Sequence, residues 1–375
     1  MPMTINTNIN SLNAQRNLGG SQMSLATSMQ RLSSGLRVNS AKDDAAGLAI
    51  AERMNTQVRG LNVAARNAND GISLAQTAEG ALGKVGDMLQ RMRELAVQSA
   101  NATNSIADRA ALDAEVQQLK AEIGRVATTT SFNGQKILDG TFTNKAFQVG
   151  ANSGETITVA SVANVQTNAL GVSTRASVNS AAISGFATTA VTAGDITING
   201  TDIGALGVAA NTADRANQLV TAINAVSQTT GVTAIIDTTS NSIQLNSAAN
   251  IVIAGAAPAP FTAATTTAAA TTGISSVDVL SSGSASQALA TIDTALDSVN
   301  TSRGTLGALQ SRFENAIGNI QVTAENLSAA RGRIVDADFA AETANLSRAQ
   351  ILQQAGTAMV AQANQLPQQV LSLLR

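Results

Sequence analysis

The chain has 375 residues, 44% of them hydrophobic and 2% aromatic, and a formal net charge of −2 at pH 7. Because it contains no Cys and no His, disulfide bonds, thiol nucleophiles and the histidine ligands and bases of most metal sites and enzymes are excluded, so we expect no enzyme and no cofactor. The slightly acidic charge offers no basic surface to a nucleic acid, and no stretch reaches the ~18 consecutive apolar residues of a membrane span.

The first predicted element is an amphipathic helix near the N-terminus. The segment lacks the basic and apolar regions of a conventional secretion signal, so none is expected. Its apolar residues recur at helical spacing and form one narrow stripe, which needs a partner surface. The stripe consists of Leu25, Met29, Leu32 and Leu36.

A long coiled-coil helix is predicted next, from about Asp44 to Asn101, because apolar residues alternate by four and three along it. At ~1.5 Å per residue it would be on the order of 85 Å long. Asp43 and Asp44 are adjacent carboxylates, which can serve acid–base chemistry, but at a helix start we expect them to cap free N–H groups. Arg91 and Arg93 lie away from the apolar seam, on a face that the pattern alone describes as solvated.

A second helix and a hairpin region are expected between the long helix and the middle of the chain. The helix carries Leu112, Val116 and Ile123 in the same alternation, and Asp108 is placed to cap its start. The stretch SFNGQKILDGTFTNKAFQVGANSGETITV follows, with Asn-Gly and Asp-Gly turn signals and short alternating strands. We expect one or more hairpins there, docked on a helical bundle.

The middle of the chain, residues 175–272, has a different composition. Charged residues are sparse, and Thr, Ala, Ser and Gly dominate in runs such as FTAATTTAAATT. Strands are predicted around Ile196 and Ile198, Ile243 and Leu245, and Ile251 and Ile253, with a short helix through Leu219 and Ile223. This middle domain is expected to be small and α+β.

Helical texture returns in the last hundred residues. A third seam runs from Leu289 to Leu327 and can join the other two in a bundle. Asp336 and Asp338 follow it, and two carboxylates without further ligands favour a surface position over a cation site. The chain ends on a second apolar stripe, the natural partner of the first, formed by Leu352, Ala355, Met359, Leu366, Val370 and Leu373.

Three long blocks of sequence closely resemble the N-terminal region of bacterial flagellins. They are RLSSGLRVNSAKDDAAGLAIAERM, RNANDGISLAQTAEGAL and LQRMRELAVQSAN. SRAQILQQAGTAMVAQANQLPQQVLSLLR resembles the flagellin C-terminal region, and DITINGTDIGAL with ANQLVTAINAVSQTTGVTAIID resembles a small module inserted in many flagellins.

The resemblance implies a mainly α filament subunit that polymerises for bacterial swimming. Its fold would be a discontinuous coiled-coil and helical-bundle rod with a β-hairpin and a small α+β inserted outer domain. The implied domains are an inner terminal coiled-coil domain of residues 1–43 with 334–375, a helical rod of 44–174 with 273–333, and a variable outer domain of 175–272. A hook–filament junction protein of the same superfamily is the alternative, because it shares the terminal helices.

The resemblance also implies partners and a location. The chain would be secreted by the flagellar type III route into the extracellular filament. Its partners would be other copies of itself, an export chaperone on the C-terminal segment, and the filament cap and hook–filament junction proteins. Toll-like receptor 5 would recognise the monomer on a surface that matches the family motif at Leu89, Gln90, Arg91, Glu94, Leu95 and Glu115.

Overall fold

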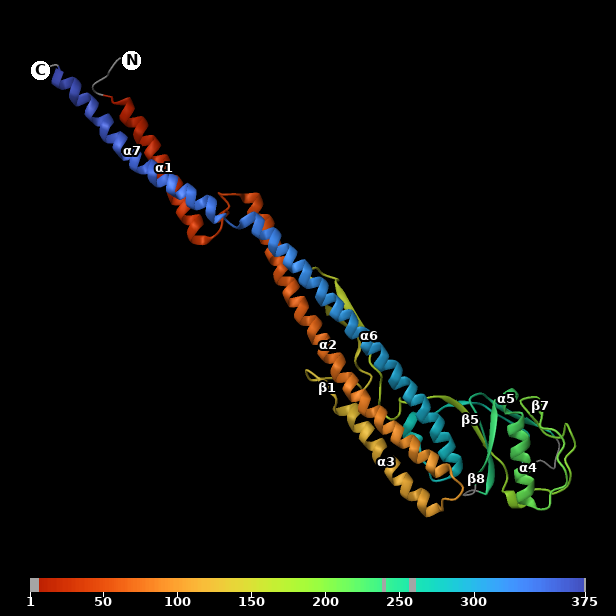
Figure 1. Ribbon diagram of the computed structural model, residues 1–375. Coiled ribbons are helices and arrows are strands. Elements are labelled where there is room, and N and C mark those ends of the chain that lie inside the picture. The colour runs from red at the N-terminus through yellow and green to blue at the C-terminus, as the bar shows by residue number, and fades with distance from the viewer. Residues whose placement is uncertain (1–6, 238–240, 256–260, 374–375) are drawn as a thin grey trace. The chain divides into compact units, whose positions relative to one another are not determined.

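The computed structural model is mainly helical, and it describes residues 7–237, 241–255 and 261–373, with side chains up to residue 365 (Figure 1). The chain divides into two compact units, which we call the terminal unit (residues 1–68, 148–156 and 315–375) and the central unit (residues 69–147 and 157–314). The expected long helix is confirmed, with bounds one residue from those predicted. The long helices are α1 (Ile9–Ser34), α2 (Ala45–Ala100), α3 (Ile106–Thr129), α6 (Ser282–Val335) and α7 (Phe339–Leu373).

Helix α2 starts where the carboxylate of Asp44 meets its first free amides. Asp44 Oδ1 accepts a hydrogen bond from the Gly47 amide at 2.8 Å, so the capping role is confirmed for this residue. Asp43 instead holds the preceding turn, because its Oδ2 accepts from the amide and hydroxyl of Ser40 at 2.9 and 3.0 Å. These bonds lower the pKa of Asp43, the Ser40 hydroxyl contributing most.

Helices α3 and α7 also begin at polar caps. Ser105 and Asp108 form a reciprocal capping box at the start of α3. Asp338 Oδ1 accepts from the Ala340 amide at 2.9 Å and caps α7, which accounts for this carboxylate without a cation.

In the terminal unit, α1 packs along α7 (Figure 1). The connectors beside this pair are joined by the backbone: Leu36 and Asp336 form an antiparallel bridge, and the Ala337 amide donates to the Gly35 carbonyl at 2.9 Å. Gly35 ends α1 with φ of 72°, a left-handed conformation that glycine adopts without strain. A second small core of this unit buries Leu61, Ala64 and Ile320.

In the central unit, the predicted seams of α2, α3 and α6 are buried at most positions, and Leu112, Leu119 and Leu289 are half-buried. Phe313 of α6 lies against Gly71 of α2, where a Cβ would come within 2.6 Å of the ring, so no larger side chain fits without displacement. Phe147 meets the same ring edge-on at 5.6 Å between centroids. The fully buried seam residues include Leu82, Val85, Leu89, Met92, Val116, Ile123, Ile292 and Val299.

Two short hairpins follow α3. Strands β1 (Ser131–Phe132) and β2 (Gln135–Lys136) are joined by Asn133 and Gly134, whose φ angles of 47° and 77° are those of a tight two-residue turn. Strands β3 (Thr143–Gln148) and β4 (Thr156–Ser161) form the second pair. The Asp139–Gly140 signal marks a bend in the loop between β2 and β3 and no hairpin, and Asp139 Oδ1 accepts hydrogen bonds from the Thr141 amide and hydroxyl there.

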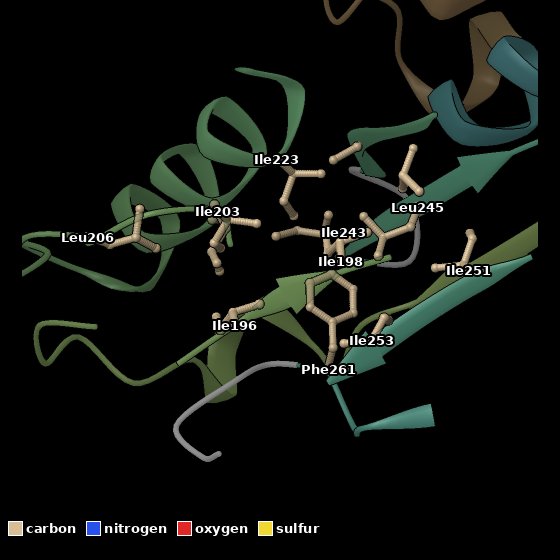
Figure 2. Close-up of a cluster of buried hydrophobic side chains, with 14 of the residues drawn as sticks. Ile196, Ile198, Ile203, Leu206, Ile223, Ile243, Leu245, Ile251, Ile253 and Phe261 are labelled. Carbon is tan, nitrogen blue, oxygen red and sulfur yellow. The ribbon is translucent and has the colours of Figure 1, made fainter. Parts of the chain in front are cut away.

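The middle domain contains two four-stranded sheets, in the orders β11-β10-β6-β7 and β12-β5-β9-β8, with helix α4 (Thr212–Ala225). Figure 2 shows Ile198, Ile243, Leu245 and Phe261 pointing toward one another in its core. The predicted helix and three strand sites are present, but five strands were not predicted. The strands are β5 (Thr174–Asn179), β6 (Thr197–Ile198), β7 (Thr201–Asp202), β8 (Val232–Asp237), β9 (Ser242–Ser247), β10 (Ile251–Ala254), β11 (Ala264–Thr266) and β12 (Ala269–Ala270); the short helix α5 (Ser227–Thr230) precedes β8.

Candidate assembly and recognition surfaces

The terminal helix pair, α1 with α7, is held by small and polar contacts. Leu18 lies against Gly356, where a Cβ would come within 3.1 Å of the leucine side chain. The Ser11 hydroxyl donates to Asn364 Oδ1 at 2.8 Å, and Ser11 is itself buried. Small residues bring the helices close, but they cover little apolar area, so the pair has a thin core.

Large apolar side chains remain exposed on this pair. Met23 is 70% exposed and Met359 is 63% exposed, although methionine side chains are usually buried. A groove of about 490 Å³ runs between the helices, with Leu352 and Met359 on its wall. The exposed set is Ile9, Leu12, Met23, Met29, Phe339, Ile351, Leu352 and Met359.

The predicted assembly stripes fall partly on the contact and partly on the open surface. Leu25, Leu32 and Leu36 are half-buried, whereas Met29 is exposed. On α7, Leu352, Ala355 and Met359 are exposed. The side chains of Leu366, Val370 and Leu373 lie outside the described residues.

Sequence reasoning missed one ionic contact of the terminal pair. Arg31 on α1 approaches the carboxylate of Glu342 on α7 at 3.9 Å, and Glu342 is 7% exposed. A buried carboxylate that faces one cation of the partner helix is a candidate register marker, but an acidic residue within a polar helix gives no sequence signal.

The predicted recognition surface separates into a buried half and an exposed half. Leu89 and Leu95 are 0% and 1% exposed, so they lie in the core beneath the predicted surface and not on its exposed face. Each is three residues from the buried Met92, and side chains three apart share one helix face. Gln90 and Glu94 lie on the outer face and are exposed.

An ion-pair cluster lies on the exposed half. Arg91 Nε donates to Glu115 Oε1 at 2.8 Å, and its Nη1 donates to Glu94 Oε2 at 3.0 Å. Glu115 first, and then Glu94, raise the pKa of Arg91 above its ordinary value. The cluster joins α2 to α3, and its half-exposed groups are screened by solvent, which leaves them able to exchange partners.

A neighbouring ion pair, also missed from the sequence, joins α2 to α6. Arg93 Nε donates to Asp293 Oδ1 at 2.7 Å, which raises the pKa of Arg93. Within residues 7–237, 241–255 and 261–373, no three His, Cys, Asp or Glu side chains converge as metal ligands would. In the same residues, no helix combines the length and the hydropathy of a membrane-crossing segment.

Comparison with known proteins places the whole chain in one family. B-type flagellin of Pseudomonas aeruginosa is 40% identical over 100% of both chains, and flagellin D of Vibrio anguillarum is 44% identical, also over 100% of both. A model of the bacterial flagellin N-terminal helical region matches residues 5–143, and a model of the C-terminal helical region matches residues 289–374. The chain belongs to the bacterial flagellin family.

The remaining comparisons describe the parts of this flagellin. A family model of the flagellin hook IN motif matches residues 195–249, which confirms the predicted resemblance of the middle domain to an inserted module. The solved FliC structure from Burkholderia pseudomallei is 26% identical, with a TM-score of 0.39 over 64% of this chain and 99% of that one.

Family membership gives this flagellin a structural role. Flagellins are not enzymes; they polymerise with themselves into the filament of the bacterial flagellum, outside the cell, and the filament serves motility. The exposed apolar residues of the terminal helix pair and the ion-pair cluster around Arg91 are therefore surfaces of a structural protein.

Proposed function

We propose that this flagellin elongates the swimming filament by burying its terminal helix pair against the same pair of neighbouring copies. The observation that carries the proposal is the exposure of Met23, Met359 and their apolar neighbours in a single chain. Head-to-tail contacts that do not close generate a helical polymer, and each subunit then needs no thick core of its own. In this proposal, the two apolar stripes of α1 and α7 form the assembly surface.

Seeded polymerisation tests this proposal. We expect Met359→Asp to stop elongation of purified seeds, because an unpaired carboxylate would be buried at the contact. Val208→Asp is the matched control, since Val208 is 74% exposed in the middle domain and carries no assembly contact in this scheme. Equal filament growth by both variants in electron micrographs would reject the terminal pair as the assembly surface.

The same assay separates the filament subunit from a hook–filament junction protein. A filament subunit continues to add to its own ends and gives long polymers, whereas a junction protein adds to a hook end once and stops. Long filaments from purified chain alone support the first function and exclude the second.

We also infer a functional division into three domains. An inner domain of residues 1–43 with 334–375 lines the filament, a rod of 44–174 with 273–333 surrounds it, and the outer domain of 175–272 faces solvent. The division is supported by the outer domain's own apolar core. It is also supported by the two segments that connect this domain to the rest of the chain, where the Thr271 amide donates to the Ser173 carbonyl at 2.8 Å. Chain entry and exit thus lie side by side.

A second proposed function is recognition of the monomer by Toll-like receptor 5. The surface consists of Gln90, Arg91, Glu94 and Glu115. Arg91 is already oriented across two helices, and an oriented guanidinium is suited to bidentate contacts with a partner carboxylate. Because the face would also pack between subunits, recognition requires depolymerised protein.

Receptor signalling by purified monomers tests this surface. We expect the triple variant Gln90→Ala, Arg91→Ala, Glu115→Ala to reduce receptor signalling at least about tenfold, the usual effect of losing a charge-assisted contact. Leu95 is left unchanged because its truncation would open a cavity in the core. Arg125→Ala removes a comparable exposed ion pair, with Glu122, and serves as the control. Full signalling by the triple variant would refute the surface.

Three further partners are proposed: an export chaperone before assembly, and the filament cap and hook–filament junction proteins at the filament ends. An export chaperone is expected to hold the C-terminal segment, about residues 346–375, before assembly, since Ile351, Leu352 and Met359 are exposed apolar side chains there. The filament cap and hook–filament junction proteins would contact the same terminal pair. Co-purification tests the chaperone proposal. The chaperone should be lost after removal of residues 346–375 and retained after removal of residues 174–270.

A further inference from the structure

A polar groove of about 520 Å³ lies in the central unit, between the sheet β12-β5-β9-β8 and the first turns of α6. Arg175 on β5 and Asp278, just before α6, are the charged residues of its lining. The other lining side chains are small or bear hydroxyl and amide groups, and none is aromatic. The groove is thus a concave surface dense in hydrogen-bonding groups, with one cation and one anion.

Arg175 is the cation of this groove, and only part of its hydrogen-bonding capacity is used. Its Nε donates to Ser173 Oγ at 2.9 Å, and among the described residues its guanidinium has no other hydrogen-bond acceptor. Burial lowers the pKa of Arg175, and the nearby Asp293 opposes this shift only in part. Asp293 is itself engaged by Arg93 at 2.7 Å. The guanidinium therefore presents free N–H donors in a half-buried position, where a charge gains most from an anionic partner.

The wall beside Arg175 is held in place by side-chain hydrogen bonds. Gln287 Nε2 donates to Ser177 Oγ at 3.1 Å and to Asn246 Oδ1 at 2.9 Å. These contacts fix an amide, a hydroxyl and a second amide at one edge of the groove. Fixed groups of this kind offer alternating donors and acceptors, the arrangement that vicinal hydroxyl groups of a ligand require.

We propose that this groove binds a small polyhydroxylated carboxylate, such as a sugar acid, with its carboxylate on Arg175 and its hydroxyls along the Ser177–Gln287 edge. A monoanion fits better than a phosphate, because one guanidinium matches one carboxylate fork and Asp278 would repel a dianion. The Asp278 carboxylate accepts from ligand hydroxyls. The proposal concerns the folded central unit of a single chain and does not depend on polymerisation.

Titration of monomeric protein with D-glucuronate, followed by NMR chemical shifts, tests the site. We expect saturable shifts of groove residues with a Kd in the millimolar range, about what one half-buried charge pair and a few hydrogen bonds provide. D-glucuronamide, the neutral isostere, and acetate, which lacks hydroxyls, should each bind about tenfold more weakly or worse. Absence of saturation by D-glucuronate up to about 50 mM, a level well above such a Kd, would overturn the proposal.

Two variants test the residues. Arg175→Gln should weaken glucuronate binding at least about tenfold, while Arg125→Gln, at an exposed pair on α3, should not. Ala290→Leu fills the groove from α6 and leaves Arg175 intact, so it tests the cavity even where Arg175→Gln disturbs β5. Unchanged binding by either groove variant, or equal binding of acetate and glucuronate, would reject the assignment.

Discussion

The terminal helix pair and the middle domain solve the burial of apolar residues in opposite ways. The middle domain encloses Ile198, Leu219 and Ile243 completely, in a core drawn from strands and one helix (Figure 2). The terminal helix pair buries Ser11 and Ser28 and leaves Met23 and Met359 open. The middle domain buries its apolar residues within a single chain. The terminal helix pair has exposed apolar side chains of the kind that neighbouring copies bury.

This difference supports the proposal that polymerisation depends on the terminal helix pair. Stability of the middle domain is a property of one chain, because its core contacts are internal. Stability of the terminal helix pair should depend on concentration and polymerisation, because its largest apolar side chains gain partners only there. Variants that change one region and spare the other therefore test whether only the terminal helix pair depends on neighbouring copies.

The largest expected effect comes from removing part of the terminal helix pair. Deletion of residues 351–375 should abolish polymerisation, because it removes the α7 side of the groove and the exposed Ile351, Leu352 and Met359. Sedimentation and electron microscopy of seeded samples measure the loss.

Excision of the middle domain is the matched control. Residues 174–270 can be replaced by two glycines, because the Ser173 amide donates to Thr271 Oγ1 at 3.0 Å and the chain ends already meet. We expect this variant to polymerise. Failure of the excised protein, or growth of the truncated one, would reverse the roles of the two regions.

The second prediction compares single truncations in the two regions. Ile223→Ala should lower the free energy of unfolding of the middle domain by about 2–5 kcal/mol, since Ile223 is fully buried and its loss leaves a cavity. Met359→Ala should change monomer stability by less than ~0.5 kcal/mol, as exposed substitutions do. Urea unfolding of monomers measures both. Equal costs would mean that the terminal pair is already a finished core.

The sequence predicted the helices better than the sheets. The four-three alternation identified α2 because each seam residue repeats the same burial over many turns. Strands β11 and β12 lie in the run FTAATTTAAATT, which has no alternation of apolar and polar residues. β11 pairs with the preceding strand β10, and β12 pairs with β5, which is distant in sequence, so strand pairing and not a local pattern imposes their structure.

The geometry of the proposed recognition surface could be predicted only in part, for a similar reason. The helix phase places Gln90, Arg91 and Glu94 outside, but the motif also contains Leu89 and Leu95, which the same phase buries. The Arg91–Glu115 pair depends on the register of α3 against α2, which no local pattern encodes. The groove at Arg175 brings together β5, β9 and α6 and left no sequence signal.

The third prediction concerns Gly273, which lies where the chain leaves the middle domain and has a φ of 62°. A Cβ at this glycine would lie 2.4 Å from the Leu170 carbonyl oxygen. Gly273→Ala therefore combines backbone strain with a backbone clash and should cost about 1–3 kcal/mol in the central unit. Gly185→Ala, at an open site of the middle domain with nothing within 4 Å, is the control and should unfold like the wild type.

The smallest predicted effect is a pH dependence at the start of α3. The Ser105 hydroxyl, followed by the Ser105 amide, lowers the pKa of Asp108 below its ordinary 3.8. A carboxyl whose pKa is depressed by folding stabilises the protein above the unfolded-state value, and this contribution is lost as the pH falls through the folded-state value. Wild type should therefore be more stable than Asp108→Asn at neutral pH, and the difference should shrink below pH 3.8.

Urea unfolding at neutral and acidic pH measures this difference, and the comparison between variants cancels the titration of the other carboxyls that both proteins share. Asp87→Asn is the control, because Asp87 lies in the interior of α2, where no free amides need a cap. A stability gap between wild type and Asp108→Asn that stayed constant from neutral to acidic pH would show that the asparagine loses packing or propensity instead of an ionised cap. A gap that closes with acid locates the α3 capping energy in the charge on Asp108, which belongs to one chain and should be the same in monomer and filament.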